Sequence, residues 1–431
     1  MLGLLCELVV GRLSMLPILN NLANRAWPKT GEREAEAAMK FGIKAWRNGG
    51  RERVGSLDLC NNNNAIETPA LVLTTRKGLP TYISPDLLPF VASSDSCLLH
   101  ASPLHFLETA SPKTISNIGG LHQLVSLHDY SFTAAPRDSI LCLPEYESTN
   151  KMGASFETTC GRRLIKPAEY MELVSALNPN LWATLADEVP AWVSEKRNKT
   201  SVDRTVRWLD ECMALDKVGS RNVLGAIVGG SSIEQRIRCA QEVTRRNVSG
   251  YWLGGFGLGE TMDERTALLC AVTDILPKER PRQISGLDLP EEVLEGVASG
   301  IDLFDSTYIY HLTLGGCALT FPLNRSERHI SDAGNDIKIN LKATMYRKDT
   351  SPIIDDCQCY TCQNHTRAYI NHLLNVHEML AQILLEIHNT HHYLGFFRAI
   401  REAIKEGQFD LFHENFVESR HDHLTAVAAN S

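Results

Sequence analysis

Short apolar runs alternate with amphipathic segments between residues 224 and 304, and this alternation constrains the fold more than any other feature of the sequence. Residues 224–228 have the length of a buried strand, and residues 233–246 follow with helical spacing, with Ser231 and Ser232 placed to cap them. The unit recurs as strands and helices at 250–253 and 261–276, 283–287 and 290–298, and a last strand at 300–304. Because the connections are short, we expect parallel strands with right-handed crossovers, which predicts an α/β fold.

Earlier parts of the chain fit the same alternation less regularly. Strands are expected at 68–74 and 181–185, and helices at 85–91 and 167–177. Between residues 121 and 166 the pattern is interrupted by Ser, Thr, Pro and charged residues, which predicts a long irregular loop. Eight strand and helix units would close a barrel, whereas fewer would form an open sheet. Periodicity alone favours neither.

Composition excludes some functions before any motif is considered. The 431 residues include 43 Lys and Arg and 51 Asp and Glu, a net charge of −8, so overall charge does not predict nucleic-acid binding, although a local basic face remains compatible with it. No run of about 18 apolar residues is present, which excludes a membrane span. Residues 1–38 have no basic start before their apolar run, so we interpret them as a poorly ordered extension before an ordered region from about Met39.

Three cysteines within six positions, Cys357, Cys359 and Cys362, form the strongest chemical motif. Three adjacent thiolates repel one another, and a soft divalent cation, with zinc as the default, removes the conflict. A fourth ligand is needed, and spacing alone does not select it from the six histidines that follow, which are His365, His372, His377, His388, His391 and His392. A site closed by three Cys and one His is structural, because no position is left for water.

Two further features have both a functional and a purely structural interpretation. Asp187, Glu260 and Asp305 each follow an expected strand, so they can converge at the ligand-binding end of a parallel fold or serve as helix caps and loop acids. Residues 393–412 form an amphipathic helix with an apolar face of Tyr393, Phe396, Phe397 and Ile400. That face can cover the core, and the basic stripe beside it can contact phosphates.

Together these residues resemble the tRNA-guanine transglycosylase family over about residues 39–412. His388, twenty-six positions after Cys362, reproduces the zinc pattern of the family and thereby selects the fourth ligand. The glycine-rich run 254–260 and the strand 300–305 resemble the family's loop and its nucleophile strand, and 119–122 and 185–188 match more weakly. The resemblance implies an irregular (β/α)8 TIM barrel at 39–350, a zinc-binding subdomain at 351–392 and a C-terminal helix and tail at 393–431.

Members of this family exchange a guanine in tRNA for a modified base. One aspartate attacks the ribose and a second carboxylate handles protons, as in retaining glycosidases. The present chain departs from that pattern. The Asp-Ser-Gly-Gly-Phe-Gln segment that carries the second carboxylate is absent, Asp138-Ser139 is interpreted as a coincidental match, and Val228 stands where the family has the glutamine that reads the base.

These departures resemble the branch of non-catalytic accessory subunits of the eukaryotic queuine tRNA-ribosyltransferase. The resemblance implies a heterodimer with a catalytic subunit, tRNA as the RNA partner, queuine exchange at wobble position 34 of tRNAs with GUN anticodons, and one structural Zn²⁺ per subunit. It implies no catalytic residue, with Asp305 and Asp187 as vestigial candidates, and a location in the cytoplasm or peripherally at the mitochondrial outer membrane. We expect the partner interface at the zinc subdomain and the apolar face of residues 393–400.

Two alternatives remain open at this point. The chain can be a self-sufficient transglycosylase with Asp305 as the nucleophile and Asp187 in the base pocket. It can also be a zinc-stabilised barrel that binds other proteins and no RNA.

Overall fold

The computed structural model describes residues 39–47, 49–59, 65–91, 98–108, 111–216, 222–323 and 337–418. The extension expected at residues 1–38 lies outside these ranges. Within them, no helix is both long and apolar enough to cross a membrane.

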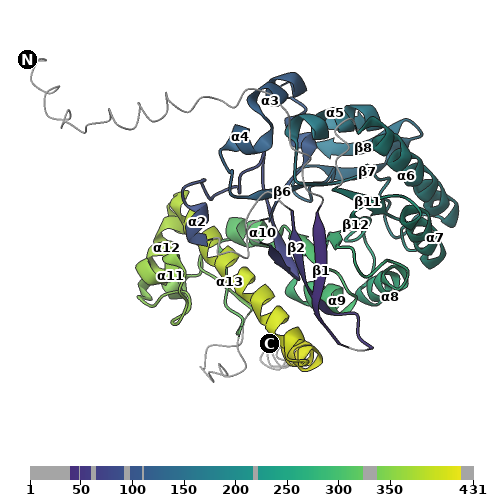
Figure 1. Cartoon of the computed structure of the whole chain (residues 1–431). Coiled ribbons are helices and arrows are strands. Elements are labelled where there is room, and N and C mark those ends of the chain that lie inside the picture. Colours follow the sequence, from purple (N-terminus) through teal and green to yellow (C-terminus); the bar gives the residue numbers. More distant parts are fainter. Residues whose placement is uncertain are drawn as a thin grey trace, which may run out of the picture. The chain divides into compact units, whose positions relative to one another are not determined.

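A closed barrel of eight parallel strands forms the centre of the chain (Figure 1). In order around the barrel, the strands are β4 (Ala70–Thr74), β5 (Leu98–Ala101), β6 (Ser131–Ala134), β10 (Leu181–Ala183), β11 (Val223–Ile227), β12 (Gly250–Leu253), β13 (Arg282–Ser285) and β14 (Leu303–Ser306). The pairing of β14 with β4, with Asp305 opposite Val72, closes the ring. The barrel decides between the two folds that periodicity left open, and it confirms the fold that the family resemblance implied.

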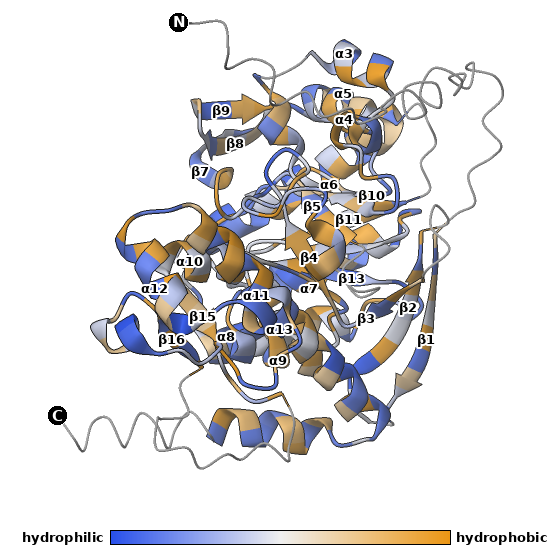
Figure 2. Cartoon of the chain, turned by 90° about the vertical axis from the view of Figure 1, so that its left-hand side faces the viewer, coloured by the Kyte–Doolittle hydropathy of each residue, from blue (hydrophilic) through white to orange (hydrophobic). Residues whose placement is uncertain are grey.

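Helices follow the strands and cover the outside of the barrel, while hydrophobic residues gather on the central strands (Figure 2). They are α2 (Leu88–Val91), α3 (Pro112–Ile118), α4 (Leu121–Val125), α5 (Pro167–Leu177), α6 (Glu195–Leu215), α7 (Ile233–Thr244), α8 (Met262–Thr273), α9 (Pro290–Ala298) and α10 (Tyr308–Gly315), with the 3-10 helix η2 (Pro103–Phe106). Ser232 caps α7 by accepting the N–H of Gln235, as predicted. The units predicted between residues 224 and 304 are all present, with ends shifted by a few residues.

The prediction of an irregular loop at residues 121–166 is wrong. This segment contains α4, the barrel strand β6 and a three-stranded antiparallel sheet of β7 (Leu143–Asn150), β8 (Gly153–Thr158) and β9 (Gly161–Ile165). The strand β6 reads Ser-Phe-Thr-Ala, so it lacks the apolar run that marks the other barrel strands. Strand β9 is exposed at all but its last residue, whereas β8 is mostly buried, and charged residues pair across these strands, as Arg162 does with Glu157. Polar residues here therefore indicate a surface sheet.

A second antiparallel sheet precedes the barrel, with strands β1 (Lys40–Trp46), β2 (Arg53–Asp58) and β3 (Ile66–Thr68). Arg53 of β2 makes two hydrogen bonds of 2.8 and 2.6 Å to the carboxylate of Asp302, just before β14. Both side chains are buried, and Asp302 also accepts the backbone N–H of Arg282. This paired charge fastens the sheet to the starts of β13 and β14, at the end of the barrel opposite Asp305.

The chain after α10 builds a smaller part with its own hydrophobic cluster, which includes Leu341, Ile353, Ile370 and Leu384. Its elements are β15 (Cys317–Leu319), β16 (Lys338–Asn340), the 3-10 helix η3 (Thr344–Lys348), α11 (Tyr360–Asn364), α12 (Arg367–Asn375) and the long helix α13 (Leu380–Lys405). Helix α13 runs without interruption through residues 392 and 393, where the sequence suggested a boundary. Residues 409–418 form a further helical segment.

The apolar face of α13 belongs to the core, so the partner interface expected on it is wrong. Tyr393, Phe396, Phe397 and Ile400 are all fully buried in the main hydrophobic cluster. The ring of Phe397 packs 5.8 Å from that of Phe304 on β14. Helical periodicity reveals that a face is apolar, but it does not reveal what covers that face.

Candidate metal centre and barrel mouth

Cys357, Cys359, Cys362 and His388 meet where the start of α11 faces the middle of α13. Nδ1 of His388 lies 3.8, 3.5 and 3.3 Å from the three sulfur atoms in that order, and all four ligand atoms lie within 4.8 Å of one another. A tetrahedral zinc ion, about 2.3 Å from sulfur and about 2.1 Å from nitrogen, separates S and N by about 3.6 Å. These four residues can therefore hold one metal ion in the arrangement shown.

Local structure prepares this geometry. Cys359 caps α11, and its Sγ accepts the backbone N–H of Cys362 at 3.3 Å, so one helical turn brings two thiols together. Nε2 of His388 lies 2.9 Å from the carbonyl oxygen of Leu319, which only accepts, so Nε2 donates and Nδ1 is free to face the thiols. Asn389 accepts the N–H of Leu319 at 2.9 Å and donates to the carbonyl of Cys317 at 3.0 Å. Strand β15 thus orients His388 toward the three thiols.

Asp305 faces the inside of the barrel at the end of β14. Its Oδ2 accepts a hydrogen bond of 2.8 Å from Ser285 on β13, and Ser285 accepts the indole N–H of Trp252 at 2.9 Å. Burial raises the pKa of Asp305 to about 7, although the Ser285 hydrogen bond acts in the opposite direction. A carboxyl with a perturbed pKa at this end of a barrel strand is typical of a ligand-binding or catalytic site.

Several buried polar atoms on the same inner surface have no hydrogen-bond partner within the described ranges: Oδ1 of Asp305, Nε2 of Gln283 and both ring nitrogens of His100. Thr133 on β6 donates to Oε1 of Gln283 on β13 across the barrel at 3.1 Å, so both residues face the interior. His100 lies opposite Thr133 in the ladder of β5 and β6 and shares its side. Burial lowers the pKa of His100 to about 4, so its ring is neutral at neutral pH. The interior beside Asp305 is therefore polar and incompletely satisfied.

The glycine-rich loop 254–259 packs against buried side chains and backbone of the neighbouring loops. Glu188 accepts the N–H of Gly255 at 2.6 Å and pairs at 3.0 Å with Arg137, which also donates to the carbonyl of Phe256 at 2.8 Å. A Cβ at Gly257, whose φ is +68°, would lie 2.6 Å from the carbonyl oxygen of Gly286. Sequence spacing did not indicate the buried pair of Arg137 and Glu188, because its partners are 51 residues apart.

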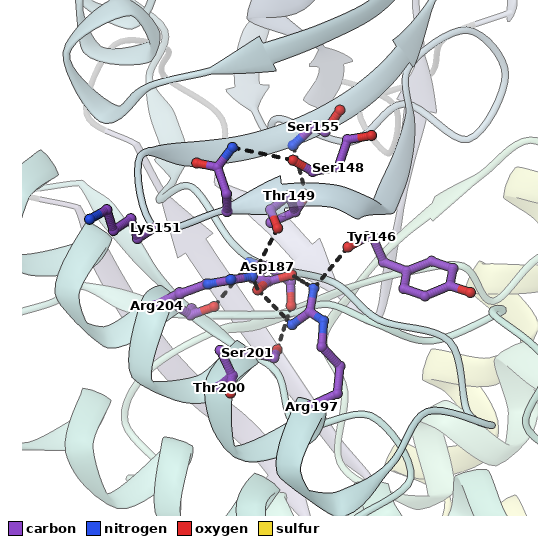
Figure 3. Close-up of polar contacts among 12 residues, drawn as sticks. Tyr146, Ser148, Thr149, Lys151, Ser155, Asp187, Arg197, Thr200, Ser201 and Arg204 are labelled. Carbon is purple, nitrogen blue, oxygen red and sulfur yellow. Dashed lines mark hydrogen bonds and ion pairs between the residues drawn. The ribbon is translucent and has the colours of Figure 1, made fainter.

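Asp187 is held by two arginines of α6 (Figure 3). Arg197 donates to both carboxylate oxygens at 2.8 and 2.7 Å, and Arg204 donates to Oδ2 at 3.0 Å. The same arginines donate to carbonyls of β7, Arg197 to Tyr146 at 3.1 Å and Arg204 to Thr149 at 3.0 Å. Asp187 therefore links the end of β10 to α6 and, through the arginines, to the inserted sheet.

The three acids that follow strands do not interact directly. Glu260 accepts the backbone N–H groups of Gly257 and Leu258 at 2.6 and 3.0 Å and the Nε of Arg265 at 2.9 Å. Within the described parts of the chain, no hydrogen bond or ion pair joins any two of Asp187, Glu260 and Asp305. Glu260 thus accepts the free backbone N–H groups of the turn that precedes it. Of the three acids, Asp305 alone faces the polar interior.

Asp138, which the sequence led us to set aside, is a buried acid that follows β6. It accepts a hydrogen bond of 2.8 Å from Nε2 of His105, and it accepts the N–H groups of Ile140 and Leu141. Nδ1 of His105 accepts the N–H of Lys77 at 3.3 Å, so neither ring nitrogen is free for a metal, although Cys142 lies within ligand distance of the pair. The signal that could have identified Asp138 is its position after a strand, and this signal was missed because β6 was not recognised in the sequence.

Comparisons with known proteins agree with the architecture. Residues 48–422 match the model of the family described as queuine tRNA-ribosyltransferase. The chain is 33% identical to queuine tRNA-ribosyltransferase accessory subunit 2 of Xenopus tropicalis, over 87% of this chain and 98% of that protein. It is 35% identical to the human protein of the same name, over 70% and 84%, and 30% identical to queuine tRNA-ribosyltransferase of Thermus thermophilus, over 86% and 92%. With its closed barrel and its three-cysteine, one-histidine centre, the chain belongs to the queuine tRNA-ribosyltransferase family.

Proposed function

We propose that this chain is the non-catalytic accessory subunit of a queuine tRNA-ribosyltransferase that exchanges guanine for queuine at position 34 of tRNAs with GUN anticodons. The observation that carries the proposal is the similarity to accessory subunit 2 over 98% of the Xenopus tropicalis protein. In this role the chain forms a heterodimer with the catalytic subunit and supports binding of the tRNA. We place this role in the cytoplasm, or peripherally at the mitochondrial outer membrane.

The barrel mouth supports a non-catalytic role. Base exchange through a covalent intermediate requires a nucleophile and a second carboxylate that handles protons. Asp305 is in the position of the nucleophile, but Asp187 is committed to Arg197 and Arg204, and Asp138 to His105. Val228, at the position of the base-reading glutamine, is a fully buried aliphatic residue with no group to recognise a base.

One observation favours the alternative of a self-sufficient transglycosylase. Asp305 has an unsatisfied Oδ1 and a pKa raised by burial to about 7, in a polar interior. These are properties of a functional carboxylate as well as of a vestigial one. Activity of the isolated chain decides between the two.

We propose that the bound metal is one structural Zn²⁺. The site offers four protein ligands of the softness that zinc prefers, and two of its cysteines are part of the second hydrophobic cluster. Bound zinc would neutralise the thiolates and cross-link α11 to α13. The metal would then stabilise the smaller part of the chain, which has a modest core of its own.

A partner surface fits the exposed aromatic and apolar residues of this smaller part. Tyr360 is 47% and Tyr369 is 40% exposed, and the ring of His365 contacts both, at centroid distances of 5.8 and 5.3 Å. Met379, 65% exposed, precedes α13 as its N-cap on the same part of the chain. Large exposed apolar groups of this kind mark interaction surfaces, with aromatic residues as the usual anchors.

The test is incorporation of labelled queuine into a GUN-anticodon tRNA by this chain alone, by a catalytic subunit alone and by the mixture. We expect turnover in the mixture only, and no loss of joint activity in Asp305→Asn. Turnover by the lone chain that Asp305→Asn abolishes would instead establish a self-sufficient enzyme. A mixture no more active than the catalytic subunit, with no RNA bound, would leave a protein scaffold as the function.

A further inference from the structure

A cavity of about 240 Å³ opens beside the barrel mouth and is separate from the interior that contains Asp305. Its lining comes from loops after three neighbouring strands: Arg76 and Lys77 after β4, His105 and Glu108 after β5, and Cys142 after β6. The turn between β8 and β9, with Cys160, completes it. Loops at this end of the strands are the ones that bind ligands in parallel barrels.

The cavity has an excess of positive charge. The side chains of Arg76 and Lys77 are exposed, and neither makes an ion pair or hydrogen bond with any residue that the structure describes. The acid that lines the cavity, Glu108, accepts a hydrogen bond of 2.6 Å from Arg163. Asp138 accepts a hydrogen bond from His105, is buried behind that ring and does not line the cavity. Two cations without a side-chain partner among the described residues therefore line one cavity, in a chain whose net charge is −8.

The backbone that presents these cations is unfavourable for a lysine. Lys77 has a φ of +54° and Gly78 a φ of +91°, in a two-residue turn closed by hydrogen bonds between Arg76 and Leu79. Such turns favour Asn or Gly at the first position, because a longer side chain is strained in the left-handed region. The N–H of Lys77 donates to His105, which holds the turn in place. A residue kept in a disfavoured conformation points to a role for its side chain.

We propose that this cavity binds a phosphate group and that, if the proposed function holds, the group is a backbone phosphate of the tRNA. Arg76 supplies paired N–H donors and Lys77 a mobile point charge, the two ways in which proteins hold phosphate oxygens. The cavity lies at the mouth face of the barrel, among the segments that follow β4, β5 and β6. Free inorganic phosphate would be bound by the same two side chains, so the first experiment tests the RNA and inorganic phosphate separately.

The first experiment uses the thiol of Cys160 as a reporter within the cavity. The full chain with its catalytic partner is treated with iodoacetamide, and mass spectrometry follows alkylation of Cys160 in the presence of either a GUN anticodon stem–loop RNA or inorganic phosphate. An RNA at ten times its Kd should slow this alkylation about tenfold, since only the unbound fraction reacts. At the same RNA concentration, protection should fall to about twofold in the double variant Arg76→Gln/Lys77→Asn, because this variant should bind about tenfold more weakly. Asn at position 77 tolerates the left-handed backbone.

The second experiment measures the Kd of the same RNA against KCl concentration by fluorescence anisotropy. The double variant should weaken binding about tenfold and reduce the slope of log Kd against log salt by about 1, the effect of one lost phosphate contact. The matched control is Lys113→Gln/Lys199→Gln, which removes two exposed charges from α3 and α6 that do not line the cavity and should leave affinity and slope unchanged.

The outcomes separate the cavity from the proposed function. RNA that binds without protecting Cys160, and with equal salt slopes in both double variants, overturns the cavity proposal and leaves the accessory role intact. Protection by inorganic phosphate but not by RNA overturns the tRNA as the source. If the complex binds no RNA, the accessory role fails, and absence of protection by inorganic phosphate then overturns the phosphate site as well.

Discussion

Oδ2 of Asp305 lies 2.8 Å from Oγ of Ser285, a hydrogen bond between neighbouring barrel strands, while Oδ1 of the same carboxyl is buried without a hydrogen-bond partner among the described residues. A carboxylate with both oxygens satisfied would ionise in its usual range. Here burial dominates and raises the pKa to about 7. The barrel therefore holds an acid that is half protonated near neutral pH.

This relationship predicts how stability depends on pH. The pKa of Asp305 is raised in the folded chain, so the unfolded chain loses its proton first, near pH 4, and the folded chain follows near pH 7. The contribution of Asp305 to the free energy of unfolding is therefore fully present below about pH 4 and lost by about pH 7. Asp305→Asn should match the wild type at pH 4 and be the more stable protein at pH 8, in urea titrations at both values. Equal stability at pH 8 would contradict the raised pKa.

Asp187 is predicted to stabilise the fold. Asp187→Asn removes the charge that two arginines share, and it should lower the free energy of unfolding by about 3 kcal/mol, the cost of breaking a buried pair. Asp203→Asn is the matched control. Asp203 also lies on α6, but its ion pair with Arg238 of α7 is exposed, so its loss should lower the free energy of unfolding by only about 0.5 kcal/mol. Chemical denaturation measures both. Unchanged stability combined with lost joint activity would instead give Asp187 a functional role.

The metal centre predicts one zinc per chain, measured by elemental analysis of the purified protein. Cys362→Ala should lose the zinc, lower the melting temperature and expose the region from α11 to α13 to protease, since the ion cross-links these helices. Cys270→Ala is the control, because this half-buried cysteine of α8 lies outside the metal group and should keep the full zinc content. Substoichiometric zinc in the wild type would contradict the assignment.

The candidate metal-binding group could be predicted from the sequence because the chemistry of its residues restricts the alternatives. Three thiols within six positions already implied a soft cation, and the family spacing selected His388, which the structure brings to the cysteines. The second half of the barrel was equally readable, since strands such as β12 are continuous apolar runs and α7 begins at a capping serine. Local residue types determine these features.

The features that the sequence did not reveal depend on contacts between distant residues. The strand β6 was missed because its inner positions carry hydroxyls, among them Thr133 bonded to Gln283 across the barrel. The face of α13 around Phe397 was read as a possible interface, because periodicity does not show that Phe304 covers it. The role of Asp187 depends on arginines 10 and 17 residues away, and spacing alone does not show where their side chains point.

The proposed partner surface gives a last prediction, on heterodimer formation. Phe397 is in the core, so Phe397→Glu should unfold the chain, and any loss of partner binding in this variant follows from misfolding. Tyr369→Glu places its charge on an exposed ring that stacks with His365, so it should leave the circular dichroism spectrum and zinc content unchanged. It should nevertheless reduce co-purification with the catalytic subunit at least about tenfold, the effect expected for an aromatic anchor at an interface.

Tyr146→Glu, on the inserted sheet and away from the metal-binding part, serves as the control and should pair normally. Normal pairing of Tyr369→Glu would move the interface off the aromatic cluster of Tyr360, His365 and Tyr369, whereas failure of Tyr146→Glu alone would place it on the inserted sheet.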